Sequence, residues 1–80
     1  MKVVRIQGQI VNMDISIKFG KRVKAIRIKK RMSQGDVAKK LGVSISYISQ
    51  IERGLENLSL KGVEQLAKAL RVSITELTKL

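Results

Sequence analysis

The sequence holds few of the side chains that catalysis or metal binding usually needs. Its 80 residues include no histidine and no cysteine, which removes the commonest general base, the commonest zinc ligand and every thiolate. No two of its six carboxylates stand out as a close pair. They are Asp14, Asp36, Glu52, Glu56, Glu64 and Glu76. We therefore expect no catalytic residue, no metal site and no cofactor, and we predict that the protein is not an enzyme.

A short polar segment around residues 44–53 is better suited to recognising another molecule. A helix over 45–53, drawn with 100° per residue, turns Ile48 and Ile51 inward and leaves the opposite side polar and uncharged up to Arg53. An ordinary surface helix of so basic a protein would carry Lys or Glu there. Amide and hydroxyl groups hydrogen-bond to base edges, and an apolar side chain can contact a thymine methyl group. The residues that we expect to read DNA bases are Ser44, Ile45, Ser46, Tyr47, Ser49 and Gln50. The alternative is a polar face that arose by chance.

A second set of polar residues is suited to binding phosphate. Gln34 would stand in the first turn of a helix over 34–41, where backbone N–H groups also favour an anion. The phosphate-binding residues that we predict are Ser33, Gln34, Arg53, Asn57 and Lys61. Helix capping and ordinary solvation explain these side chains equally well.

One ion pair is expected between two of these elements. Glu52 lies toward the inward edge of the helix over 45–53, and Arg27 follows the apolar Ile26 on an earlier helix. We predict that Arg27 and Glu52 form a partly buried, structural ion pair that ties the two helices together.

Five helices must position these residues, and serine and glycine mark their ends from Ser16 onward. The helices are predicted over about 16–30, 34–41, 45–53, 60–70 and 74–80. Ser33 with Asp36, and Ser73 with Glu76, have the spacing of capping boxes. Gly42 suits the left-handed turn between the second and third helices. We predict an all-α, compact five-helix domain over 16–80, with a helix-turn-helix unit at 33–54.

Residues 1–15 differ from the rest of the chain. Val4, Ile6, Gly8 and Ile10 alternate with polar residues, which is the period of a strand. We see no obvious partner strand within the chain. The segment therefore either pairs with a second subunit or forms a mobile, partly ordered arm, and we favour the arm.

Charge and size indicate the kind of partner. The formal net charge is +11, and residues 1–40 carry twelve Lys and Arg against two acids. Such an imbalance favours a polyanionic partner, although a solvated surface is the simpler alternative. A domain this small buries only roughly 60% of its unfolded surface, so a homodimer would help it. No apolar run is long enough for a membrane span or a signal peptide, and we expect a soluble, cytoplasmic protein.

The combined pattern resembles the phage-repressor-like helix-turn-helix family, the Cro and repressor type also called XRE. The resemblance rests on FGKRVKAIR, MSQGDVAKKLGVS, YISQIERG and LSLKGVEQLAKALRVSITEL, which together run from about Phe19 to Leu77. It implies five helices, of which the second and third read DNA. It also implies that Gln34 binds phosphate, that Ser44, Ile45, Ser46 and Gln50 face bases, and that Arg27 pairs with Glu52.

Within that family, YISQIERG followed by NLSLKGVE looks most like the controller proteins of restriction–modification systems. The chain departs from them at Ile45, where Arg or Gln is common, and at Leu55 and Glu56, where a basic residue is frequent. These differences concern which bases are read. A phage repressor and an antitoxin remain alternatives to a controller protein, in a bacterial, archaeal or phage source.

These observations lead to one expected function and two alternatives. We predict a sequence-specific regulator that binds double-stranded DNA as a homodimer on a two-fold symmetric operator, with no small-molecule ligand and no membrane contact. The dimer interface is predicted on the last helix, at Ile74, Leu77 and Leu80. One alternative is a protein-interaction module of the same fold, such as an antitoxin or a bridging factor. The other is non-specific binding to nucleic acid or a membrane surface through the basic first helix.

Overall fold

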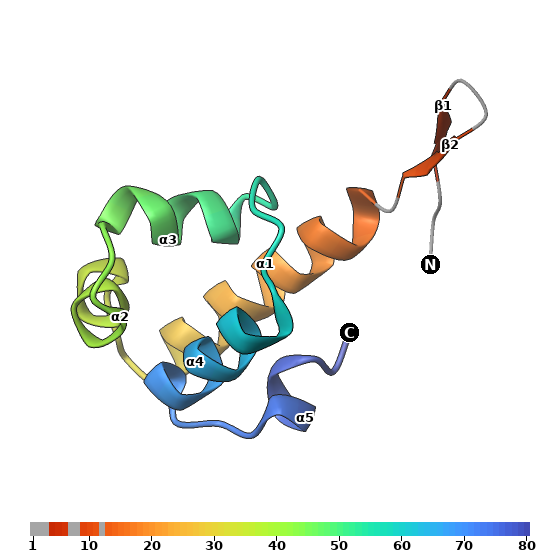
Figure 1. The fold of residues 1–80 in the computed structure, drawn as a ribbon. Coiled ribbons are helices and arrows are strands. Elements are labelled where there is room, and N and C mark those ends of the chain that lie inside the picture. The colour runs from red at the N-terminus through yellow and green to blue at the C-terminus, as the bar shows by residue number, and fades with distance from the viewer. Residues whose placement is uncertain (1–3, 7–8, 12) are drawn as a thin grey trace.

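The fold consists of a small β-hairpin followed by five helices (Figure 1). The computed structural model describes residues 4–6, 9–11 and 13–80, with side chains from residue 15 onward. The strands are β1 (Val4–Ile6) and β2 (Gln9–Val11). The helices are α1 (Met13–Lys29), α2 (Gln34–Leu41), α3 (Ile45–Glu52), α4 (Leu60–Leu70) and α5 (Ile74–Leu77). The helices form one body, and the hairpin projects from the N-terminal end of α1.

The two strands pair with each other, which corrects the expectation that the N-terminal strand has no partner in the chain. β1 and β2 are antiparallel, with Val4 opposite Val11 and Arg5 opposite Ile10. The alternating run thus folds back on itself, and its two halves form one ladder. The parts of the predicted arm at 1–3, 7–8 and 12 lie outside the described residues.

Helix bounds agree with the sequence where the end signals are strong and differ where they are weak. α2 and α4 span the predicted residues, and α3 ends one residue early, at Glu52. α1 begins at Met13, so Ser16 lies inside the helix and is not its N-cap, and the boundary predicted between 15 and 16 falls within α1. α5 ends at Leu77, three residues before the predicted end.

Serine side chains cap four of the helices. Ser33, Ser44, Ser59 and Ser73 each accept a hydrogen bond at Oγ from the backbone N–H three residues later. Such a cap contributes about 1 kcal/mol to stability. At α2 the box is complete, because Asp36 also accepts the Ser33 N–H at 2.8 Å.

Hydrogen bonding favours the ionised form of that capping carboxylate. The hydrogen bonds of Asp36 with the Ser33 backbone and side chain lower its pKa, with a smaller effect from the positive charges of Lys40 and Lys39. A carboxylate in the first turn also interacts favourably with the helix dipole. The start of α2 is therefore firmly set.

An aliphatic core joins all five helices. Val23 and Ile26 of α1 meet residues of the other four helices in one cluster. Six large side chains in it are essentially inaccessible to solvent: Ile48, Leu66, Leu70, Leu77, Val23 and Val37. Burying each such side chain stabilises the fold by roughly 1.5–3 kcal/mol. The core thus holds α3 against α1 and α2 without an aromatic centre.

Candidate nucleic-acid interface

Helix α3 is fixed at its C-terminal end by very close approach to α1. A Cβ atom on Gly20 of α1 would lie 2.4 Å from the carbonyl oxygen of Ile51 and 2.6 Å from that of Glu52. Gly54, just after α3, has φ 77° and leaves no room for a Cβ atom beside Ile17. The backbones of α1 and the end of α3 are therefore in direct contact, which sets the direction of α3.

The buried carboxylate of Glu52, in the last turn of α3, accepts two hydrogen bonds from Arg27 of α1. Glu52 Oε2 accepts from Arg27 Nε at 2.6 Å, and its Oε1 accepts from Arg27 Nη2 at 3.1 Å. The side chain of Arg27 is 11% exposed and that of Glu52 is 3% exposed. Arg27 also donates to the Met32 carbonyl at 2.9 Å. The ion pair that the helical wheel predicts between Arg27 and Glu52 is present, and it ties α1 to α3.

Gln34 takes part in the same network, which the sequence did not indicate. Its Nε2 donates to Glu52 Oε1 at 3.0 Å and so joins the first turn of α2 to the last turn of α3. Because an amide nitrogen carries two hydrogens, one remains for another acceptor. Gln34 is thus held in place while keeping a free donor, which suits the predicted role at a phosphate.

The outward face of α3 is open to solvent. Ser44 and Ser46 are exposed, Ile45 is 57% exposed, and Ser49 and Gln50 are partly exposed. A Cβ atom on Gly35 would lie 3.5 Å from Ile45 Cδ1, so the first turns of α2 and α3 lie side by side. The structure therefore brings most of the predicted base-reading residues onto one accessible surface.

Two of the predicted base-reading residues have other structural duties. Tyr47 is half-buried and packs against the core. Ser44 caps α3 by accepting the Tyr47 N–H at 3.1 Å. A hydroxyl that accepts still holds its own hydrogen to donate. Ser44 can therefore bind DNA while capping, whereas Tyr47 offers only part of its ring.

The predicted phosphate-binding residues come from three places around α3. Ser33 caps α2 and Gln34 follows it. Arg53 is exposed at the C-terminal end of α3, and Asn57 is exposed in the loop that leads to α4. Lys61 is exposed in the first turn of α4. They thus come from the start of α2, from the end of α3 with the loop that follows it, and from the start of α4.

The predicted dimer residues do not share one environment. Leu77 has no exposed surface and lies in the core, so its assignment to an interface is wrong. The short α5 needs this side chain to close the domain. Ile74 and Leu80 are 47% and 52% exposed. Only these two remain available to a partner.

An ion pair between α1 and α5 was missed. Arg22 donates to the Glu76 carboxylate, and its Nε and Nη2 also bond the Glu76 carbonyl at 3.1 and 2.9 Å. Ser73 still caps α5 by accepting the Glu76 N–H at 3.0 Å. The complete capping box predicted for Ser73 and Glu76 is therefore wrong, because the carboxylate turns to Arg22 instead. Arg22 and Glu76 are 54 residues apart in the sequence, and only the folded structure shows that they are in contact.

Neither a metal site nor a membrane-spanning helix is found among the described residues. Within residues 15–80, no group of three acidic side chains converges as a metal site would require. None of the helices in the described part of the chain is both long and apolar enough to cross a membrane.

Known proteins have sequences similar to this chain. The profile of the Helix-turn-helix family matches residues 23–77. Control protein C.BamHI of Bacillus amyloliquefaciens is 42% identical over 65 residues, which cover 80% of each chain. The regulator SinR of Bacillus subtilis is 41% identical over 57 residues, 70% of this chain and 51% of SinR.

Solved structures agree in fold. The restriction-modification controller protein C.AhdI of Aeromonas hydrophila superposes with a TM-score of 0.76 at 37% identity, over 81% of this chain and 94% of that one. The controller protein C.Esp1396I, solved as a tetramer with its natural 35-base-pair operator, gives 0.74 at 37% identity, over 81% and 86%. With its helices, core and ion pair in place, this chain belongs to the helix-turn-helix family.

Proposed function

We propose that this chain is a sequence-specific transcriptional regulator that binds double-stranded DNA as a homodimer, with α3 in the major groove. The observation that carries the proposal is the outward face of α3. It is polar and accessible, while the inward face and the end of the helix are fixed by the core, by Gly20 and by Arg27. A rigid helix with exposed amide and hydroxyl groups suits direct reading of base edges. Such a protein needs no enzymatic activity and no cofactor, and it would act in the cytoplasm.

The relatives support the same proposal. C.Esp1396I was solved on its operator, and SinR is a transcriptional regulator by name. C.Esp1396I shares the helical arrangement of the segment that contains α2 and α3, and SinR is similar to this chain in the sequence of that segment. A role as a controller protein follows most directly from C.BamHI and C.AhdI.

Homodimerisation would use the apolar surface near the C-terminus. Leu80 lines a depression together with Ile15, Phe19 and Leu58, and Ile74 is exposed on α5. Two copies related by a two-fold axis would place two α3 helices about 34 Å apart, one turn of DNA.

Selection of bound duplexes from a random double-stranded pool, at about physiological salt, tests the proposal. Non-specific binding is weak at that salt. We expect enrichment of a two-fold symmetric site with half-sites about one turn apart. If no sequence is enriched, the proposal fails and a protein partner becomes the better explanation.

Gln50→Ala tests the role of one side chain on the enriched site. Loss of a base contact is expected to relax preference at one base pair in each half-site, by about 1–3 kcal/mol. Gln65→Ala, an exposed glutamine on α4, is the matched control and should leave preference unchanged. A uniform loss of affinity for all sequences would show that Gln50 does not read a base.

A further inference from the structure

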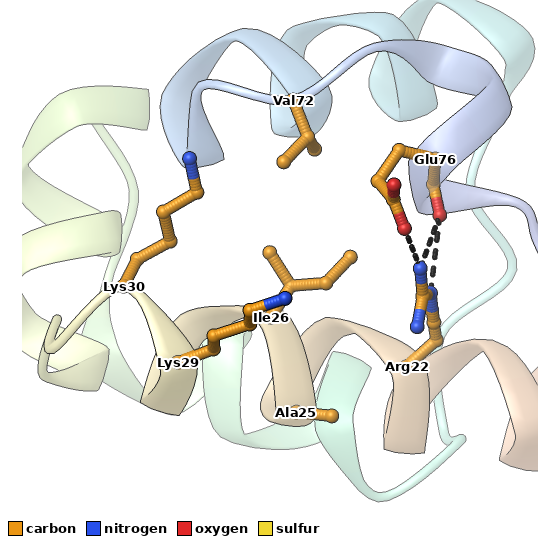
Figure 2. Close-up of a pocket in the computed structure, with 7 residues that line it drawn as sticks. All are labelled: Arg22, Ala25, Ile26, Lys29, Lys30, Val72 and Glu76. Atoms are coloured by element: carbon orange, nitrogen blue, oxygen red, sulfur yellow. Dashed lines mark hydrogen bonds and ion pairs between the residues drawn. The ribbon is translucent and has the colours of Figure 1, made fainter.

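A second surface, distant from α3, is rich in cations and concave. It consists of three depressions that are lined by residues of α1, α2, α4 and α5 and of the turns that follow α1 and α4. Figure 2 shows the first, of about 280 Å³, where Lys29 and Lys30 lie on one side and Arg22 contacts Glu76 on the other. The second, of about 620 Å³, is lined by four cations and one carboxylate. The third, of about 400 Å³, lies between α2 and α4.

The three depressions adjoin one another, because neighbouring ones share a lining residue. Lys30 lines the first and the second, and Lys40 lines the second and the third. We call the cations along this path the cationic strip. It consists of Lys29, Lys30, Arg71, Lys39, Lys40 and Lys68.

The carboxylates that line these depressions are already engaged. Glu76 pairs with Arg22, and Asp36 accepts the Ser33 N–H at 2.8 Å within the capping box of α2. By contrast, Lys39, Lys40 and Lys68 are exposed on their helices. The strip therefore presents a positive potential that its own acids offset only in part.

The strip does not overlap the proposed base-reading surface. The residues that line the three depressions include none from α3. In Figure 1, α3 and the turn between α4 and α5, which holds Arg71, lie on opposite sides of the helical body. A molecule on the strip would leave the face of α3 free.

The chemistry of the strip favours a phosphate backbone over a protein. Protein interfaces usually have an apolar centre that anchors the partner. Apolar residues also line these depressions, but Met32, Leu41 and Val72 are half-buried, and none of the large apolar side chains that are exposed among the described residues is in the lining. A row of cations along a concave path instead matches the regular charge of a nucleic-acid strand, which is bound largely through release of counterions.

We propose that the cationic strip binds the backbone of a second DNA duplex while α3 occupies the first, so that the protein bridges two duplexes. This inference rests on the proposed function for the first duplex only. Contact with the second duplex is independent of its sequence, because Lys and Arg bind phosphates that carry no base information.

A capture experiment tests the bridge. The selected duplex is immobilised in excess over protein, so that every bound α3 face is occupied, and a labelled duplex lacking the site is added. We expect wild-type protein to retain the labelled duplex. We expect Lys39→Gln/Lys40→Gln/Lys68→Gln to lose most of this retention, with a log–log salt slope smaller by about 2.7, three phosphate contacts at about 0.9 each.

The variants are chosen to separate this surface from net charge. Lys30 and Arg71 stay unchanged, because Lys30 Nζ donates to the Arg71 carbonyl at 3.3 Å and Arg71 has φ 59°. The matched control, Lys18→Gln/Lys21→Gln/Lys24→Gln, removes three exposed charges from α1 outside the three depressions. It should retain the labelled duplex. Thermal unfolding monitored by circular dichroism verifies that both variants are folded.

Binding to the immobilised duplex alone, measured in parallel, keeps the two proposals apart. If wild-type protein binds the immobilised duplex but does not retain the labelled duplex, the proposed bridging of two duplexes is wrong and the proposed function is unaffected. Equal loss of retention in both triple variants shows an effect of net charge and also overturns the strip. Failure of wild-type protein to prefer the immobilised duplex over a scrambled one counts against the proposed function instead.

Discussion

Glu52 is the residue on which the position of α3 depends most. It is 8% exposed as a whole residue and accepts bonds from Arg27 and Gln34. A buried carboxylate is costly unless such partners satisfy it. One side chain therefore couples three elements, and the phosphate-binding candidate Gln34 is aligned by the same acid that fixes α3.

Arg27→Gln should destabilise the fold by about 3 kcal/mol, because it leaves Glu52 buried without its counter-charge. Chemical denaturation with circular dichroism measures this change. The control is Lys24→Gln, an exposed position on the same helix, where about 0.5 kcal/mol or less is expected. A loss below 1 kcal/mol for Arg27→Gln would mean that the pair is solvated and does not hold α3.

Residue roles were predictable where a helical wheel decides them. The wheel separates Ile48 and Ile51 from Ser46, and it puts Glu52 and Arg27 each beside the apolar face of its own helix, from which their pairing was predicted. It could not place Arg22 on Glu76 or Gln34 on Glu52, because both contacts depend on how distant helices cross. Helical spacing groups Leu77 with Ile74 and does not distinguish an inner from an outer apolar face, so it could not show that Leu77 is buried and Ile74 exposed.

At the scale of elements, α3 is set by a contact between backbones. Gly20 is a mid-helix residue of α1, where glycine costs about 1 kcal/mol relative to alanine. It is needed there because the carbonyl oxygens of Ile51 and Glu52 occupy the space of a Cβ atom. The fold thus accepts a weaker α1 in order to bring α3 close.

Gly20→Ala is expected to lower the free energy of unfolding by about 2 kcal/mol, because a methyl group would push against fixed backbone. Gly62→Ala in α4 should instead raise it by about 0.5–1 kcal/mol, since the nearest atom, Ser59 Oγ, would be 3.4 Å away. Thermal unfolding of the two variants compares them directly. An unchanged or increased free energy of unfolding for Gly20→Ala would contradict the close contact.

Element boundaries followed the strength of local signals. α2 has a complete capping box at Ser33 and a left-handed Gly42 (φ 72°), and its bounds were predictable. α1 has no such mark at its start, and Ser16 was a false one. The alternation of Val4, Ile6, Gly8 and Ile10 has the period of a strand but does not reveal where the chain folds back on itself, so an arm was expected in place of the hairpin.

At the scale of the whole molecule, size and charge shape the behaviour. A domain of 80 residues has a modest core, so a second copy adds buried apolar area. The net charge of +11 favours a polyanion at more than one face. The proposed homodimer and the proposed DNA contact at the cationic strip both agree with this size and charge.

Leu80→Asp should shift the protein from dimer to monomer, because it places a charge in the apolar depression that Leu80 lines. Sedimentation equilibrium at several concentrations measures the change. Ile28→Asp, at a 56% exposed position of α1, is the matched control and should leave the dimer intact. The interface lies elsewhere if both variants associate as the wild type does.

A single-site cross-link shows whether the outward face of α3 lies in the major groove. The chain contains no cysteine, so one introduced at Ser46 and coupled to a short photo-cross-linker is unique. We expect Ser46→Cys to cross-link to bases within each half-site, and Thr75→Cys, exposed on α5, to give no cross-link to the same duplex. Cross-linking from Thr75 with none from Ser46 would contradict the account, because another face would then hold the DNA.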